Sequence, residues 1–252
     1  MSELAGLNAL VTGGGRGIGA AIAAALTAKS ARVTVLGRDE AALAARIQAK
    51  EAAAYILADV TDPSGFEAVM TRIAAEGAVD ILVNNAGAAL SAPFLKTSNA
   101  DFQRMLEVNL LGPVIAARAV LPGMIARKFG RVVNIASTAA LKGYPYISAY
   151  AASKHALLGL TRTLALELAK TGVTANAVCP GFTDTDMASA SVERIVAKTG
   201  RTEEAARAEL TRTNPMGRLI APEEVADAVC FLARRESGSI TGSAIAVAGG
   251  EI

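Results

Sequence analysis

The feature that most constrains the fold of this chain is a regular alternation of two kinds of segment. Short apolar runs rich in β-branched residues alternate with alanine-rich segments whose apolar residues recur at helical spacing. Nearly continuous apolar strands joined by helices are typical of a parallel sheet with right-handed connections and helices on both faces. The alternation therefore predicts an α/β fold built on a doubly wound parallel sheet.

The expected elements cover nearly the whole of the 252-residue chain. We expect strands at 7–12, 32–36, 55–58, 80–84, 131–137, 174–178 and 243–247. We expect helices at 17–29, 39–50, 63–76, 101–125, 150–171 and 222–233. The sequence has no internal repeat or interdomain linker, which predicts a single domain over 1–252. The strandless excursion at about 182–215 is expected to act as a substrate lid.

Composition excludes several classes of protein. Hydrophobic residues make up 52% of the chain and charged residues 19%, which excludes a disordered or collagen-like chain. The formal net charge is only +2 and the basic residues are scattered, so we expect a small-molecule partner and neither nucleic acid nor a membrane. The first residues lack a basic leader, and charges or glycines interrupt each apolar stretch. These features predict a cytoplasmic protein without a membrane span.

The sequence offers little for metal or thiol chemistry. Cys179 and Cys230 lie far apart without CxxC spacing, and His155 is the only histidine. We expect no protein-ligated metal and no catalytic triad built on another histidine. His155 points about 100° away from Lys154 around a helix, and we interpret it as structural. Cys179 is expected to pack at a strand end as a small hydrophobe.

A glycine-rich turn follows the first expected strand and opens the first helix. Its sequence over 12–19 is TGGGRGIG. Backbone amides and a helix N-terminus converge at such a turn, and glycines let a phosphate approach the backbone. A flexible turn without a ligand is the alternative, but the place in a βαβ unit favours a dinucleotide site in a Rossmann-like fold. The expected cofactor-binding residues of the turn are Gly13, Gly15, Arg16, Gly17, Ile18 and Gly19.

The spacing of Gly13, Gly17 and Gly19 resembles the TGxxxGxG signature of the short-chain dehydrogenase/reductase family. Further motifs of that family follow in matching order along nearly the whole chain. They are Asp59-Val60, Asn84-Asn85-Ala86-Gly87, Asn109, Ser137, Tyr150-xxx-Lys154 and Pro180-Gly181.

This resemblance implies further contacts with the cofactor. Asp59 and the Val60 backbone would contact the adenine, and Asn85, Ala86 and Gly87 would line the cofactor ribose. Asn84 is expected to brace the strand ends instead. The contacts implied on the carboxamide side of the cofactor come from Pro180, Gly181, Thr183 and Thr185.

The end of the second expected strand predicts the choice of cofactor. An acidic residue there accepts hydrogen bonds from the ribose 2′-hydroxyl of NAD, whereas an arginine accommodates the 2′-phosphate of NADP. This chain has Gly37 at that position, and the following Arg38 is placed to clamp the phosphate together with Arg16. We expect NADPH/NADP+ rather than NADH. The alternatives are that both arginines are solvated, or that the neighbouring Asp39 selects NAD.

The candidate catalytic residues follow from spacing and position. Tyr150 and Lys154 lie four residues apart in an expected helix, where an ammonium group would favour the tyrosinate and bring the tyrosine pKa closer to the operating pH. Taken alone, this YxxxK pattern is mostly structural. Ser137 ends an expected strand at the carboxyl edge of the sheet, where ligands bind, although a turn or cap is the alternative. Asn109 interrupts an apolar helix, which is costly unless its amide has partners.

The family resemblance gives these residues a mechanism. It implies hydride transfer between a nicotinamide and a substrate carbonyl carbon, with Ser137 polarising the oxygen and Tyr150 donating the proton. Lys154 would also hold the nicotinamide ribose, and Asn109 would hold a water that extends the proton relay to the lysine. The expected catalytic residues are therefore Asn109, Ser137, Tyr150 and Lys154, of which Tyr150 and Lys154 also bind the cofactor.

The resemblance is closest to β-ketoacyl (3-oxoacyl) thioester reductases and polyketide ketoreductases, notably over 148–154, 178–182 and 186–187. The expected function is NADPH-dependent reduction of a 3-oxoacyl thioester or a related ketone to a secondary alcohol. Carrier-protein-dependent members commonly have docking arginines at positions that match Lys128 and Thr171 here, so carrier-protein docking is open against a coenzyme A thioester or a free ketone.

Two other functions remain as alternatives, an NAD-dependent secondary alcohol dehydrogenase and a non-catalytic NADP(H)-binding sensor. The helices at 101–125 and 150–171 resemble those through which the family forms oligomers, so that a homotetramer is expected.

Overall fold

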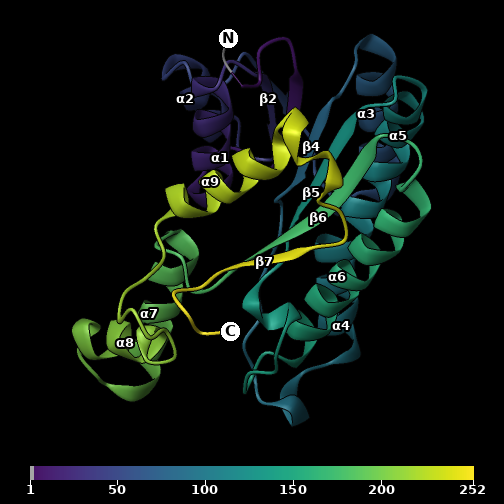
Figure 1. The fold of residues 1–252 in the computed structure, drawn as a ribbon. Helices are drawn as coiled ribbons and strands as arrows, with labels where there is room; N and C mark the ends of the chain where they lie inside the picture. Colours follow the sequence, from purple (N-terminus) through teal and green to yellow (C-terminus); the bar gives the residue numbers. More distant parts are fainter. Residues whose placement is uncertain (1–2) are drawn as a thin grey trace.

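The structure is a computed structural model that describes residues 3–252 (Figure 1). In this part of the chain, seven parallel strands form one sheet in the order β3-β2-β1-β4-β5-β6-β7. The strands are β1 Asn8–Thr12, β2 Arg32–Gly37, β3 Ala54–Leu57, β4 Ile81–Asn84, β5 Gly130–Ile135, β6 Val173–Pro180 and β7 Ala244–Val247. The predicted doubly wound parallel sheet is confirmed.

The strand order reverses at β1, and this reversal locates the ligand-binding edge. β1 pairs with β2 on one side and with β4 on the other, so the connections that leave the carboxyl ends of β1 and β4 diverge to opposite faces. In open α/β sheets the crevice at such a point binds the ligand. The glycine-rich turn directly follows β1, at this edge.

Helices cover both faces of the sheet (Figure 1). One face carries α1 Gly17–Ala28, α2 Glu40–Gln48 and α9 Pro222–Ala233. The other carries α3 Pro63–Glu76, α4 Asn99–Leu106, α5 Gly112–Ala126 and α6 Ser148–Leu168. Each face has its own apolar cluster. Ile22, Leu26 and Val229 belong to the first cluster, and Phe66, Met124 and Leu168 to the second.

The long helix expected at 101–125 is interrupted by a π-helical turn. It begins at Asn99, where Ser98 and Asp101 form a capping box, and a π-helix over Glu107–Leu111 separates α4 from α5. The π-turn places Asn109 in the protein interior with 0% exposure. An apolar periodicity that continues through 106–111 gives no sign of such an insertion, which often marks a functional site.

The same helical run overturns one expectation from the sequence. The run Asn99–Ala126 contains 28 residues and has a mean hydropathy of 1.6 in its most apolar 18-residue window, so by length and composition it is sufficient to cross a membrane. The expectation that charges or glycines interrupt each apolar stretch before it could span a bilayer does not hold for this run. Here the run packs on the sheet through Ala116, Val120 and Met124, and 39% of that window is buried inside the protein.

The excursion expected at about 182–215 contains two helices, α7 Asp186–Thr199 and α8 Glu203–Thr211. They pack on one another through Val192, Ala206 and Leu210, with Leu219 against them. The left-handed Gly200 at the end of α7 lets the chain reverse. The segment therefore has a small apolar core of its own beside the main sheet.

Candidate active site

In the glycine-rich turn after β1, the main chain lies close to the loop after β4 and to the first turn of α1. A Cβ atom added to Gly13 would lie 2.9 Å from the Ala86 Cα, and one added to Gly19 would lie 2.1 Å from the Gly13 carbonyl oxygen. The N-cap residue of α1 is Arg16, whose side chain makes no capping hydrogen bond, and the first turn of the helix contains no acidic residue. The amides of that turn are therefore left for a ligand of negative charge.

Two side chains that flank the turn hold it against β4. The Thr12 hydroxyl accepts hydrogen bonds from the amides of Asn85 and Ala86, both at 3.1 Å. The Asn85 side chain donates to the carbonyl oxygens of Thr12 and Gly13, both at 3.0 Å. Thr12 was part of the predicted motif but was not predicted as a site residue. Its position directly before the glycines was the available signal.

The two predicted phosphate-binding arginines lie at the surface, and each faces a carboxylate. Arg16 pairs with Asp39, and the Arg38 Nη1 atom lies 3.5 Å from the Asp59 Oδ2 atom. The Asp39 carboxylate also accepts a hydrogen bond from the Ala42 amide at the start of α2, and this bond, with the positive charge of Arg16, holds its pKa below the usual range. Such exposed pairs contribute little energy, so a phosphate group can replace either carboxylate.

Asp59 and Val60, the predicted adenine contacts, follow β3. The Asp59 Oδ1 atom accepts hydrogen bonds from the amide and hydroxyl of Thr61, at 2.9 and 2.7 Å. Partial burial acts to raise the pKa of Asp59, but these bonds and Arg38 hold it below its usual range. Val60 packs beside Gly112 at the start of α5. The negative charge of Asp59 is thus fixed beside Arg38.

Ser137 and Tyr150 come together although they lie in different elements. Ser137 is the N-cap of the short 3₁₀-helix η3 Thr138–Ala140 and accepts a hydrogen bond from the Ala139 amide at 3.1 Å. Its side chain also lies close enough to that of Tyr150, in the first turn of α6, to act on the pKa of the phenol. The cap that the sequence left as an alternative is therefore present, and Ser137 still approaches Tyr150.

The electrostatics of Tyr150 differ from the expectation. Burial raises the pKa of its phenol, although the hydrogen bond with Ser137 acts to lower it. The Lys154 Nζ atom lies 5.8 Å from the centre of the tyrosine ring and donates to the Ile135 carbonyl oxygen at 2.8 Å. The expected lowering of the tyrosine pKa by Lys154 is absent from this state, in which burial dominates. Burial also lowers the pKa of Lys154, to about 8.

Asn109 joins the π-turn to the loop after β4 and to α6. Its side chain accepts from the Ala88 amide and donates to the Ala88 carbonyl oxygen, both at 3.0 Å. It also donates to the Ser153 hydroxyl at 3.0 Å, which in turn donates to the Tyr150 carbonyl oxygen at 2.7 Å. Ser153, which sequence reasoning missed, therefore links Asn109 to the helix that carries Tyr150. Its place beside Lys154 on the predicted helix was the available signal.

The remaining predicted residues border the same edge of the sheet. A Cβ atom on Gly87 would lie 3.0 Å from the Asn109 Oδ1 atom and 3.5 Å from the Lys154 Nζ atom. Past Pro180 at the end of β6, the Thr183 hydroxyl donates to the Gly181 carbonyl oxygen. Thr185 follows and lies against the glycine turn, with its Cγ2 atom 3.1 Å from a Cβ atom built on Gly17. The structure thus brings the predicted residues of four strand ends together.

The other residues singled out in the sequence make contacts that support the fold. Asn84 donates to the Asn134 side chain at 2.8 Å across β4 and β5, which confirms its bracing role. His155 is exposed and faces its own helix through the Ala151 carbonyl oxygen. Cys179 is fully buried in β6, as expected, and burial raises the pKa of its thiol to about 11. Within residues 3–252, no cluster of histidine, cysteine and acidic side chains is arranged to hold a metal.

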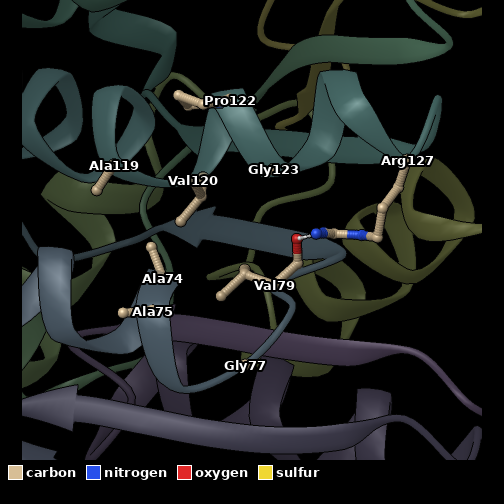
Figure 2. A pocket seen from close by; sticks show the side chains of 9 residues that line it. All are labelled: Ala74, Ala75, Gly77, Val79, Ala119, Val120, Pro122, Gly123 and Arg127. Carbon is tan, nitrogen blue, oxygen red and sulfur yellow. Dashed lines mark hydrogen bonds between the residues drawn. The ribbon is translucent and has the colours of Figure 1, made fainter.

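A pocket of about 280 Å³ lies between α3 and α5, away from these residues (Figure 2). It is lined mainly by Ala74, Ala75, Ala119 and Val120, and by Arg127 at one end. The guanidinium of Arg127 is engaged, because it donates to the Val79 carbonyl oxygen at 2.8 Å and to Asp80. Asp80 immediately precedes β4, so this pocket lies at the amino end of the strands, opposite the candidate site.

Comparisons with known proteins agree with this arrangement. A family model described as short chain dehydrogenase matches residues 7–195. Acetoacetyl-CoA reductase of Rhizobium meliloti is 40% identical over 249 residues, which are 96% of this chain and 97% of that protein. The 3-oxoacyl-(acyl-carrier-protein) reductase FabG of Escherichia coli is 37% identical over 244 residues, 96% of each chain. A variant of actinorhodin polyketide ketoreductase, solved with NADPH, is 36% identical with a TM-score of 0.91 over 97% of each chain.

Proposed function

This chain belongs to the short chain dehydrogenase family, and we propose on this basis that it is an NADPH-dependent ketoreductase that reduces a 3-oxoacyl thioester or a related ketone. The observation that carries the proposal is the junction of Ser137 with Tyr150 beside a buried Lys154, at the sheet edge where the glycine turn lies. The similar proteins named as acetoacetyl-CoA and 3-oxoacyl reductases support the substrate class. The two alternatives, an NAD-dependent alcohol dehydrogenase and a non-catalytic NADP(H)-binding sensor, are less favoured.

The turn after β1 fits the phosphates of a dinucleotide. The first-turn amides of α1 have no side-chain cap, and the glycines leave space that a side chain would fill. We propose that this turn holds the pyrophosphate and that Arg16 and Arg38 hold the 2′-phosphate. The roles of Asp59, Val60, Asn85, Ala86, Gly87, Pro180, Gly181, Thr183 and Thr185 toward the rest of the cofactor remain proposals from the family resemblance.

NADPH, when bound, supplies the hydride. The chain supplies orientation and the proton. We propose that the Ser137 hydroxyl donates to the substrate carbonyl oxygen and that the Tyr150 phenol gives its proton to the same oxygen. A raised pKa keeps the phenol protonated at neutral pH, as a proton donor requires. The charge of Lys154 would stabilise the tyrosinate that remains, and Asn109 would keep the loop at Ala88 in place.

Oxidation of NADPH and NADH at 340 nm, with three substrates in parallel, tests the proposal. The substrates are a short 3-oxoacyl thioester, an activated aromatic ketone and a simple cyclic ketone. We expect turnover with NADPH to exceed that with NADH by at least about tenfold, which corresponds to about 1.4 kcal/mol of cofactor discrimination. Preferential turnover of free ketones would contradict the acyl-thioester assignment, and tight NADPH binding without turnover of any substrate would favour a sensor.

The variant Arg38→Asp provides the cofactor control for this assay. It places an acid where the 2′-phosphate is proposed to lie, so the ratio of NADPH to NADH turnover should fall toward or below one. Glu67→Gln, an exposed substitution on α3, should leave the ratio unchanged. An unchanged ratio in Arg38→Asp would mean that Arg38 does not contact the 2′-phosphate.

The rate of ketone reduction should depend on the charge of Lys154. Burial lowers the pKa of this lysine to about 8, whereas the pKa of Tyr150 is raised. Lysine is charged below its pKa, so kcat/KM at saturating NADPH should be level below pH 7 and fall as pH rises through about 8. Enzyme returned to pH 7 should recover its full rate, which excludes irreversible loss. A level profile up to pH 10 would contradict this role for Lys154.

We also propose that the protein is a homotetramer that associates through the faces of α5 and α6. Large apolar side chains point into solvent on this run of helices, with Leu111 45% exposed, Ile125 41% and Leu166 82%. A second copy of the chain that packs on these helices would remove this apolar surface from water. The cytoplasmic location stays a prediction.

A further inference from the structure

The side chain of Glu251, next to the C-terminal residue, is buried and fully engaged. Only 2% of it is exposed, and its Oε1 atom accepts a hydrogen bond from the Tyr144 hydroxyl at 2.7 Å. The Lys142 ammonium lies 3.3 Å from the same oxygen and donates to the Glu251 main-chain carbonyl at 3.1 Å. The Thr213 side chain lies close enough to the carboxylate to help lower its pKa. Groups from three residues outside the C-terminal tail therefore surround one carboxylate.

These residues belong to two segments that lie far apart in the sequence. Lys142 and Tyr144 are in the loop between η3 and α6, which connects Ser137 to Tyr150. Thr213 lies in the turn that follows α8, near the end of the excursion at 182–215, the proposed lid. Figure 1 shows the C-terminus between the α7–α8 unit and the sheet. Glu251 thus joins the lid to the loop that leads into α6, the helix of the proposed proton donor.

The backbone of the tail is shaped to reach this position. Gly249 and Gly250 both have positive φ, at 61° and 88°, a conformation that favours glycine. A Cβ atom on Gly249 would lie 2.1 Å from the Asn214 Oδ1 atom, and one on Gly250 would lie 3.6 Å from the Pro215 ring. The tail is therefore pressed against the residues that follow Thr213.

This junction, the contacts of Glu251 with Lys142, Tyr144 and Thr213, also reaches the end of β6. A Cβ atom on Gly181 would lie 3.3 Å from the Glu251 Oε2 atom, so the carboxylate lies beside the point where the chain leaves β6 for the lid. Both ends of the lid are thus in contact with the C-terminal tail. A shift of the tail would move the lid and the loop from Ser137 to Tyr150 together.

The charge of the carboxylate is stabilised where it lies. Burial acts to raise the pKa of Glu251, but the hydrogen bonds from Tyr144, Thr213 and Lys142 hold it below the usual range. Burial and the negative Glu251 raise the pKa of Tyr144, so this tyrosine remains a hydrogen-bond donor. Hydrogen bonds to a charged group are stronger than those between neutral groups. Glu251→Gln would therefore weaken the junction, because its neutral amide has nearly the same size and shape as the carboxylate but carries no charge.

We propose that Glu251 is a positioning residue for substrate binding, which holds both ends of the lid against the loop between Ser137 and Tyr150. It acts through these segments and does not touch the reacting atoms. The inference rests on the proposed ketoreductase function for its effect on substrate. Loss of the junction would loosen the lid and weaken ketone binding, while Tyr150 stays in place on α6 and the glycine turn stays in place after β1.

Trypsin cleavage tests whether Glu251 holds the lid, and this test does not require any enzymatic turnover. Lys198, in the last turn of α7, and Arg201, just after this helix, are exposed and are the cleavage sites to be followed. In Glu251→Gln the cleavage rate should rise about tenfold, as expected when a charge-assisted hydrogen bond is lost and the open lid becomes more populated. Tyr144→Phe, a milder change, should act in the same direction. Glu67→Gln should cleave at the wild-type rate.

Steady-state kinetics test the functional half on the same proteins. In Glu251→Gln, KM for the ketone should rise about tenfold, which corresponds to about 1.4 kcal/mol, with kcat and the NADPH dissociation constant within about twofold. Thermal midpoints identify a variant that fails to fold, in which case Tyr144→Phe decides the test. Wild-type rates of lid cleavage, or a fall in kcat at unchanged KM, would overturn the proposal. If the wild type reduces no ketone, the proposed function fails, and the cleavage rates alone decide whether Glu251 holds the lid.

Discussion

Replacement of Tyr150 by phenylalanine should lower turnover by about 10³-fold and leave the NADPH dissociation constant within about twofold. The substitution removes the hydroxyl that α6 places against Ser137 but keeps the ring, so the packing around Lys154 is preserved. Without the phenol, the alkoxide that develops on the substrate has to take its proton from water. Steady-state rates give the loss, and quenching of the two proteins' fluorescence by NADPH, or calorimetry, gives the dissociation constants.

A matched control separates this effect from the loss of any hydroxyl. The Tyr55 hydroxyl donates to Glu40 at 3.0 Å on the edge strand β3, so Tyr55→Phe loses one exposed hydrogen bond and should retain the wild-type rate. Turnover of Tyr150→Phe within about tenfold of wild type would remove Tyr150 from the role of proton donor. A parallel loss of NADPH binding would instead place the defect in the cofactor site.

The architecture could be predicted from sequence because its signals are local and repeated. Each strand is a short apolar run, helices lie between consecutive strands, and two of these helices begin with a proline, Pro63 in α3 and Pro222 in α9. Strand ends in a parallel sheet meet at one edge, so the motifs after β1, β4, β5 and β6 were expected to lie together. The structure places them there.

The features that escaped prediction depend on contacts between distant residues. The π-turn around Asn109 is stabilised by Ala88 and Ser153, which lie 21 and 44 residues away in the chain. The raised pKa of Tyr150 reflects how deeply the folded chain covers the phenol, a quantity that spacing from Lys154 does not contain. Glu251 is one acidic residue in an unremarkable tail until folding brings Lys142, Tyr144 and Thr213 to it.

A single methyl group at Gly19 should damage the cofactor site more than any other substitution in the turn. The added Cβ atom would lie 2.1 Å from the Gly13 carbonyl oxygen and 2.5 Å from the Asn85 Nδ2 atom, so the turn has to open. Overpacking of this kind costs about 1–3 kcal/mol, which lowers the melting temperature of a chain of this size by several degrees. The amides at the start of α1 then no longer converge, and NADPH should bind at least about tenfold more weakly.

The same substitution at Gly77 gives the opposite expectation and completes the test. Gly77 is the exposed residue that follows α3, its backbone is extended with φ −173°, and a Cβ atom there would meet nothing within 4 Å. Alanine adopts this conformation without strain and restricts the unfolded chain, which stabilises by about 0.4–1 kcal/mol, so Gly77→Ala should raise the melting temperature and leave NADPH binding unchanged. Calorimetric melting and NADPH titration of both variants measure the contrast. Wild-type NADPH affinity in Gly19→Ala would mean that the phosphates do not lie on this turn, because its backbone cannot accept the methyl group without moving.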